Sequence, residues 1–126
     1  MGITHIGTVG IYVGDLDTSI DFYVNKLGFE LRIDADMGET RWVEVAPPNA
    51  ETSLVLTYGY AGWEPELVGK FSLVTYRCND AQATYEQLRA RGVEFAEPPA
   101  KQPWGPVAMF TTDPDGYTIL ITETGD

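Results

Sequence analysis

The chain of 126 residues has few of the groups on which much protein chemistry depends. It has one cysteine, Cys78, so no disulfide can form within the chain. This thiol lies among strand-forming residues, which favours a small buried apolar side chain over a nucleophile. A single histidine, His5, gives no basis for a Ser/His/Asp triad. The glycines are scattered at turns, so no phosphate-binding glycine-rich loop is present.

Basic residues are also scarce: eight Lys and Arg face 19 Asp and Glu, for a formal net charge of -11. Nucleic acids and anionic membranes are bound through Lys and Arg, so neither is an expected partner. The acidity instead favours solubility or a cationic ligand. The start, MGITHIGTVG, has no basic region and no long apolar run, so no signal peptide or membrane helix is expected. We therefore predict a cytoplasmic globular protein.

What the chain does have is an internal repeat. Residues 9–30 match residues 74–95, each an extended run followed by Asp, a helical spacing and a terminal Gly. Residues 41–58 match residues 106–123 at the same offset of about 65, and each reads as two strands joined by a tight turn. Each half therefore has the predicted order β-α-β-β-β.

Local chemistry supports the two helices. Asp15 and Asp80 are suitable N-caps, because a short carboxylate accepts from the free N–H groups of a first helical turn. Gly28 and Gly92 are suitable helix ends, because glycine tolerates positive φ. Helical spacing predicts apolar faces over Leu16, Ile20, Val24 and Leu27, and over Ala81, Tyr85 and Leu88. Residues 113–116, DPDG, are typical of a type I turn.

This paired architecture resembles the vicinal oxygen chelate superfamily, which includes glyoxalase I, extradiol dioxygenases, and fosfomycin- and bleomycin-resistance proteins. The stretches that carry the resemblance are VGDLDTSIDFYVNKLGFEL near the start and DPDGYTILI near the end. The resemblance implies an α+β fold in which two tandem β-α-β-β-β modules form a curled, trough-like mixed sheet with helices outside. It implies a single domain over residues 1–126, with module one at about 4–58, a linker at 59–69 and module two at about 70–124. It also implies a homodimer.

Alternation along the strands then assigns side chains to the helices or to the trough. The residues expected to face the helices include Val9, Ile11, Val13, Val43, Val45, Leu54 and Leu56. Those expected to face the trough are Thr8, Gly10, Tyr12, Trp42, Glu44, Ser53, Val55, Thr57, Leu73, Thr75, Arg77, Val107, Met109, Thr118, Leu120 and Thr122.

Metal-dependent members of the superfamily place four trough-facing ligands, usually His, Glu or Gln, in the first and last strand of each module. Carried over by the resemblance, these positions hold Thr8, Val55, Leu73 and Leu120. None of the four is a normal ligand of a divalent metal. His5 has the opposite strand parity to Thr8 and is expected to point away from the trough. We therefore expect no metal and no other cofactor.

Glu44 is the most distinctive residue left on the trough side. It is a weak candidate for a general base, a counter-charge for a cationic ligand, or a plain strand carboxylate at the rim. Arg77 has similar alternatives: a partner for Glu44, a holder of an anionic group, or the end of its strand.

Aromatic and soft apolar side chains suit a flat aromatic ligand, and they equally suit a dimer core; they are Tyr12, Trp42, Met109 and Trp104. Tyr60 and Trp63 lie in the linker, which either covers the trough or a partner chain, or forms a surface turn. The predicted ligand-binding residues are Thr8, Tyr12, Trp42, Glu44, Val55, Thr57, Leu73, Thr75, Arg77, Met109 and Leu120.

Three functional hypotheses remain. The first is a metal-free protein that binds an aromatic or cationic small molecule without chemistry, as the bleomycin-resistance resemblance implies. The second is a lyase, isomerase or dioxygenase, with relocated metal ligands such as His5 and Glu44 or with acid–base chemistry on Glu44. The third is a structural module whose trough is filled by its own side chains. The residues at the four usual ligand positions favour the first hypothesis.

Overall fold

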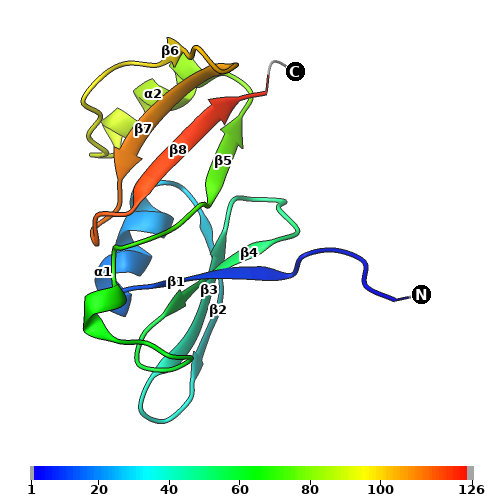
Figure 1. Ribbon diagram of the computed structural model, residues 1–126, viewed down its shortest axis with the longest axis vertical. Coiled ribbons are helices and arrows are strands. Elements are labelled where there is room, and N and C mark those ends of the chain that lie inside the picture. Colours follow the sequence, from blue (N-terminus) through cyan, green and yellow to red (C-terminus); the bar gives the residue numbers. More distant parts are fainter. Residues whose placement is uncertain (1, 125–126) are drawn as a thin grey trace. The chain divides into compact units, whose positions relative to one another are not determined.

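The computed structural model describes residues 2–124 and has two compact units. The first unit ends at Phe71 and the second begins at Ser72 (Figure 1). Residues 59–69, expected to be a linker, therefore group with the first unit. Within residues 2–124, no helix has the length and the apolar composition needed to cross a membrane.

The first unit is a four-stranded sheet with one helical segment. Its elements are β1 (Thr8–Tyr12), α1 (Leu16–Ile20), a π-helical stretch (Asp21–Lys26), β2 (Glu30–Asp36), β3 (Arg41–Ala46), β4 (Ser53–Thr57) and a short 3-10 turn (Pro65–Leu67). The strand order is β1-β4-β3-β2, with β1 and β4 parallel and the other pairs antiparallel.

The second unit repeats this arrangement. Its elements are β5 (Thr75–Cys78), α2 (Ala81–Ala90), β6 (Ala100–Lys101), β7 (Val107–Thr112) and β8 (Thr118–Glu123). The strand order is β5-β8-β7-β6, again with one parallel and two antiparallel pairs. The predicted α+β class and the tandem β-α-β-β-β order are therefore confirmed.

Both predicted helix caps are present. The Asp15 carboxylate accepts a hydrogen bond from the Thr18 amide at 2.9 Å, and the Asp80 carboxylate accepts one from the Ala83 amide at 3.0 Å. Gly28 and Gly92 have φ of 84° and 95°, in the left-handed region that favours glycine. Two local signals thus define each helix.

The buried face of the first helical segment differs from the predicted one. Leu16 is buried as expected, but the other buried side chains are Ser19, Phe22 and Tyr23 rather than Ile20, Val24 and Leu27. The π-helical stretch, in which the Leu27 amide donates to the Phe22 carbonyl five residues earlier at 2.9 Å, accounts for the change at Val24 and Leu27 only, because Ser19 and Ile20 precede it. This wider winding moves later side chains around the axis.

The core of each unit lies between its helix and its sheet. In the first unit Val13, Val43 and Val45 are fully buried on the predicted helix-facing side. In the second unit Ile119 and Ile121 from β8 and Leu88 from α2 are buried. Alternation along the strands places one row of side chains in this core, so the other face of each sheet remains for a site.

Candidate functional site

Equivalent strands of the two units pair in the same register. Gly10 pairs with Val55 between β1 and β4, and Thr75 pairs with Leu120 between β5 and β8. Both pairs are related by an offset of 65 residues. Val55 and Leu120 therefore occupy equivalent places, as the sequence repeat predicted.

The first sheet carries most of the expected site residues on one side. Tyr12 is paired with Thr57, and Glu44 with Val55, so the cross-strand neighbours share a face. We call this side the first open face; its residues are Thr8, Tyr12, Trp42, Glu44, Val55 and Thr57. Val55 and Thr57 are nevertheless buried, because β4 is a central strand, whereas Trp42 and Glu44 are half-buried.

Trp42 and Glu44 form a fixed pair on this face. The Trp42 indole Nε1 donates a hydrogen bond to the Glu44 carboxylate Oε2 at 2.8 Å. The two side chains lie two residues apart on β3 and so point the same way. The bond leaves further acceptor sites on a carboxylate that is held against a large aromatic surface.

The segment 58–63 packs onto the first open face. The Tyr60 ring lies against the Trp42 ring, with centroids 6.0 Å apart, and the Tyr12 hydroxyl donates to the Ala61 carbonyl. The Trp63 indole Nε1 donates to the Val13 carbonyl at 3.0 Å, which anchors the end of the segment. Of the two readings of this linker, these contacts favour the covering loop.

Tyr60 is a site residue that strand alternation did not identify. Its hydroxyl is buried and has no hydrogen-bond partner within the described residues. A buried polar atom without a partner carries a desolvation cost, which a ligand group can remove. The available sequence signal was the aromatic content of a glycine-containing linker, GYAGW.

In the second sheet, Leu73 departs from its expected place. Strand β5 begins at Thr75, so Leu73 lies outside the sheet and its side chain is 81% exposed. Thr75 and Arg77 pair with Leu120 and Thr122 and share their face. The expectation for Leu73 as a strand residue is therefore wrong, whereas the faces expected for Thr75, Arg77 and Leu120 agree with the register.

Met109 faces the other side from the one predicted. It pairs with Ile121 on the helix-facing side and is only 1% exposed, and Val107 shares its parity. The connection between the last two strands is one residue longer in the first unit, because Glu44 pairs with Val55 whereas Phe110 pairs with Leu120. The offset in this strand is therefore 66, and the assignment from an offset of 65 is wrong by one residue.

Phe110 takes the place that was assigned to Met109. It is the equivalent of Glu44 by strand pairing, and its side chain is 45% exposed. We call this side of the second sheet the second open face; its residues are Thr75, Arg77, Phe110 and Leu120. An aromatic residue thus stands in one unit where a carboxylate stands in the other.

The residues at the usual metal-ligand positions do not fit a divalent metal. Val55 and Leu120 are aliphatic, Leu73 is outside the strand, and Thr8 offers one neutral hydroxyl. Within residues 2–124, no three His, Cys, Asp or Glu side chains are grouped so that they could hold a metal ion. His5 lies before β1, with its Nδ1 3.0 Å from the Thr4 hydroxyl and 4.0 Å from the Glu51 carboxylate.

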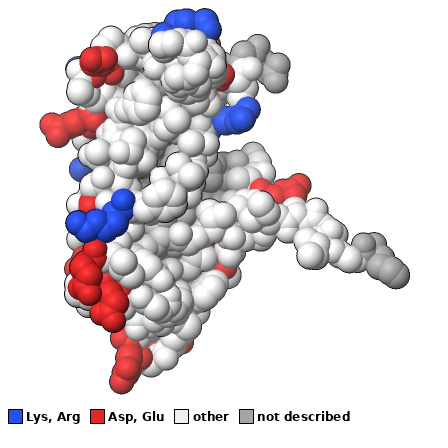
Figure 2. Space-filling model, viewed as in Figure 1, with Lys and Arg blue, Asp and Glu red and all other residues white. Residues whose placement is uncertain are grey.

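Two polar side chains that lie outside the open faces are Cys78 and Arg41. Cys78 is half-buried, where a buried side chain was predicted, and desolvation raises the pKa of its thiol, which disfavours the nucleophilic thiolate. Arg41 donates to Asp34 and Asp17, each at 3.0 Å, and these hydrogen bonds raise its pKa. On the face drawn in Figure 2, acidic side chains gather along one edge of the first unit and much of the remaining surface is uncharged.

Comparison with known proteins gives the family. The model of the Glyoxalase/Bleomycin resistance protein/Dioxygenase superfamily matches residues 2–121. The uncharacterized protein YetH of Bacillus subtilis (strain 168) is 40% identical over 122 residues, 96% of this chain and 99% of its own. A lactoylglutathione lyase of Escherichia coli O157:H7 is 30% identical over 119 residues, 90% of this chain and 88% of its own.

Among solved structures, TnmS3, an antibiotic binding protein from Streptomyces sp. CB03234, superposes with a TM-score of 0.83. It is 34% identical in sequence, and the superposition covers 98% of both chains. The repeat, the sheet order and these matches agree, and the chain belongs to the Glyoxalase/Bleomycin resistance protein/Dioxygenase superfamily.

Proposed function

We propose that this protein binds a small aromatic molecule that carries a cationic group, and that it does so without a metal and without chemical change of the ligand. The observation that carries the proposal is the first open face, where Trp42 and Glu44 are hydrogen-bonded in a fixed arrangement under Tyr60. Flat rings recognise an aromatic body, and a carboxylate recognises a cation.

The shape of the first open face supports this proposal. The Trp42 and Tyr60 rings present aromatic surface, and the buried Tyr60 hydroxyl offers a hydrogen bond to a polar ligand atom. Tyr12 holds the covering loop through the Ala61 carbonyl, so the rings are positioned before a ligand arrives. A net charge of -11 raises the local concentration of cations.

The comparisons support binding as the coarser part of the proposal. TnmS3 is an antibiotic binding protein with the same fold over nearly the whole chain, and we extend ligand binding to this protein by that likeness. The proposal includes Thr8, Val55 and Thr57 on the first open face and Thr75, Arg77 and Leu120 on the second. It also includes a cytoplasmic homodimer, since the family resemblance implies dimers.

A lactoylglutathione lyase-like activity is the second candidate, because a lyase of E. coli O157:H7 is 30% identical over most of the chain. The donor set counts against a metal-dependent form of this activity, since Val55 and Leu120 supply no ligand atoms. A metal-free form would use Glu44 as the base. In that case Glu44→Gln abolishes turnover, whereas under our proposal there is no turnover to lose.

The test is isothermal titration calorimetry with planar aromatic amines and with neutral analogues of the same shape. Glu44→Gln keeps an acceptor for the Trp42 indole but removes the charge, so we expect about tenfold weaker binding of the amines, the loss of one charge-assisted hydrogen bond. Binding of the neutral analogues is expected to stay nearly the same.

The matched control is Glu39→Gln, which removes an exposed carboxylate outside the first open face. This variant is expected to bind the amines as the wild type does. The proposal is wrong if none of the aromatic compounds binds the wild type. It is also wrong if both variants bind the amines with equally reduced affinity, because the effect would then come from net charge alone.

A further inference from the structure

The outer strand of the sheet differs sharply between the two units. In the first unit β2 has seven residues and pairs with β3 from Ala46 to Arg41. In the second unit β6 has only two residues, Ala100 and Lys101, which pair with Ala108 and Val107. Most of the edge of β7 therefore lacks the strand that the first unit has at the same place.

Two prolines account for this difference. Ala35 pairs with Trp42, and Ala100 pairs with Ala108, so Ala35 and Ala100 are equivalent positions. Counting back from them, Pro98 and Pro99 stand where the first unit has Ile33 and Asp34. Proline has no N–H to donate to a neighbouring strand. The chain consequently separates from β7 beside Met109 and Phe110.

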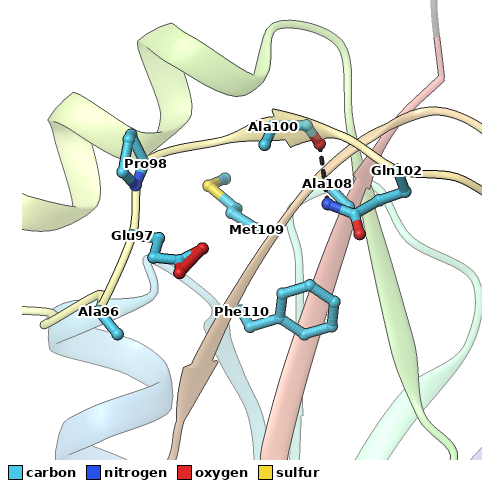
Figure 3. A pocket seen from close by; sticks show the side chains of 8 residues that line it. All are labelled: Ala96, Glu97, Pro98, Ala100, Gln102, Ala108, Met109 and Phe110. Carbon is cyan, nitrogen blue, oxygen red and sulfur yellow. Dashed lines mark hydrogen bonds between the residues drawn. The ribbon is translucent and has the colours of Figure 1, made fainter.

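A pocket lies where the two segments separate. Its volume is about 210 Å3, and it lies wholly within the second unit (Figure 3). The lining residues are Ala96, Glu97, Pro98, Ala100, Gln102, Ala108, Met109 and Phe110. At ~30 Å3 per water molecule, this is room for a compact organic group of several heavy atoms.

The lining combines one charge with soft apolar surface. Figure 3 shows the Glu97 carboxylate pointing toward Met109 and Phe110. Gln102 closes the rim, and its Nε2 donates to the Ala100 carbonyl at 2.9 Å. A carboxylate attracts a cation, a Phe ring attracts one through its face, and a thioether adapts to an irregular apolar body.

We infer that this pocket binds a small organic cation, such as an alkyl- or arylammonium group. The pocket exists because the Pro98–Pro99 pair replaces a paired strand, and the Glu97 carboxylate gives the pocket a negative charge. This site does not depend on the proposed site on the first open face, since all its residues belong to the second unit.

The test is a titration of the full chain with benzylammonium, followed by backbone amide NMR. We expect saturable chemical-shift changes of the Glu97, Gln102 and Phe110 amides. Benzyl alcohol, which has the same ring without the charge, is expected to bind about tenfold more weakly. Glu97→Gln is expected to reduce the affinity for benzylammonium by about the same factor and to leave the affinity for benzyl alcohol unchanged.

Glu94→Gln is the matched control, because Glu94 is an exposed carboxylate three residues away that does not line the pocket. It is expected to bind benzylammonium as the wild type does. Shifts confined to other residues, equal binding of the alcohol, or equal weakening by both variants would each overturn the inference. Changes at Trp42 that Glu44→Gln removes report on the first open face instead, and because Phe110 also belongs to the second open face, Glu97 and Gln102 are the residues that report on the pocket alone.

Discussion

At the scale of single residues, the carboxylates of this acidic chain have distinct structural partners. Asp15 caps a helix, Glu44 holds the Trp42 indole, and the buried Asp113 accepts from the Asp115 and Tyr117 amides at 2.9 Å each. The caps could be predicted from sequence because their partners are three residues away. The contact of Tyr60 with Trp42 could not, because it depends on how the covering loop folds back.

The Asp15 cap predicts a pH dependence of stability. Hydrogen bonds from Thr18 lower the pKa of Asp15 from its ordinary value of 3.8, so the folded state favours the ionised form. The stabilisation from the ionised cap is fully present above pH 3.8 and is lost as the pH falls through the lowered pKa of Asp15. Asp15→Ala should therefore lower the melting temperature near neutral pH, and the difference from wild type should shrink in acid.

Circular dichroism melts of the two proteins across this pH range provide the measurement. Glu94→Ala serves as the control, because Glu94 is an exposed carboxylate that follows the end of α2 and stands at no helix start. A constant difference between Asp15→Ala and wild type down to strong acid would contradict the role of the ionised cap.

At the scale of elements, order and type were predictable but two orientations were not. The β-α-β-β-β order follows from local periodicity and turn residues, which the sequence contains. The buried face of the later part of the first helical segment depends on a π-helical stretch that the spacing of apolar residues does not reveal. The face of Met109 depends on a connection one residue longer in one unit than in the other.

The turn before β8 allows a clean test of backbone conformation. Gly116 has φ of +91°, and an added Cβ would meet no atom within 4 Å, so a substitution there is costly only through its backbone. Gly116→Ala should lower the free energy of unfolding by about 1 kcal/mol. Urea denaturation measures this change.

Gly105→Ala is the matched variant for this experiment. Gly105 also has open space around an added Cβ, but its φ is not in the left-handed region. It is expected to be neutral or slightly stabilising, since alanine reduces the freedom of the unfolded chain. Equal destabilisation by both substitutions would rule out φ as the cause.

At the scale of the whole molecule, two similar units have diverged in their site chemistry. Glu44 and Phe110 are equivalent positions, as are Trp42 and Ala108, so one open face has a carboxylate beside an indole and the other has a bare ring. Val55 and Leu120, in contrast, are both aliphatic.

This common aliphatic character predicts how the purified protein behaves with metals. Protein without an affinity tag, incubated with divalent metals and desalted, should retain well below one metal ion per chain by elemental analysis, because Val55 and Leu120 supply no donors. Chelator should leave its melting temperature unchanged. Stoichiometric metal would contradict this prediction and would favour His5 and Glu44 as ligands, as in the lyase candidate.

The Pro98–Pro99 pair has a consequence for behaviour at high concentration. A strand edge with free N–H and C=O groups can recruit an identical edge from another molecule and begin fibril growth. Pro98 and Pro99 present no N–H to such a recruit, so the outer segment of the second unit cannot pair with it at these two positions. The same two residues leave part of the β7 edge without its neighbouring strand, so this edge, and not the proline segment, is the place where strand addition from a second molecule is expected.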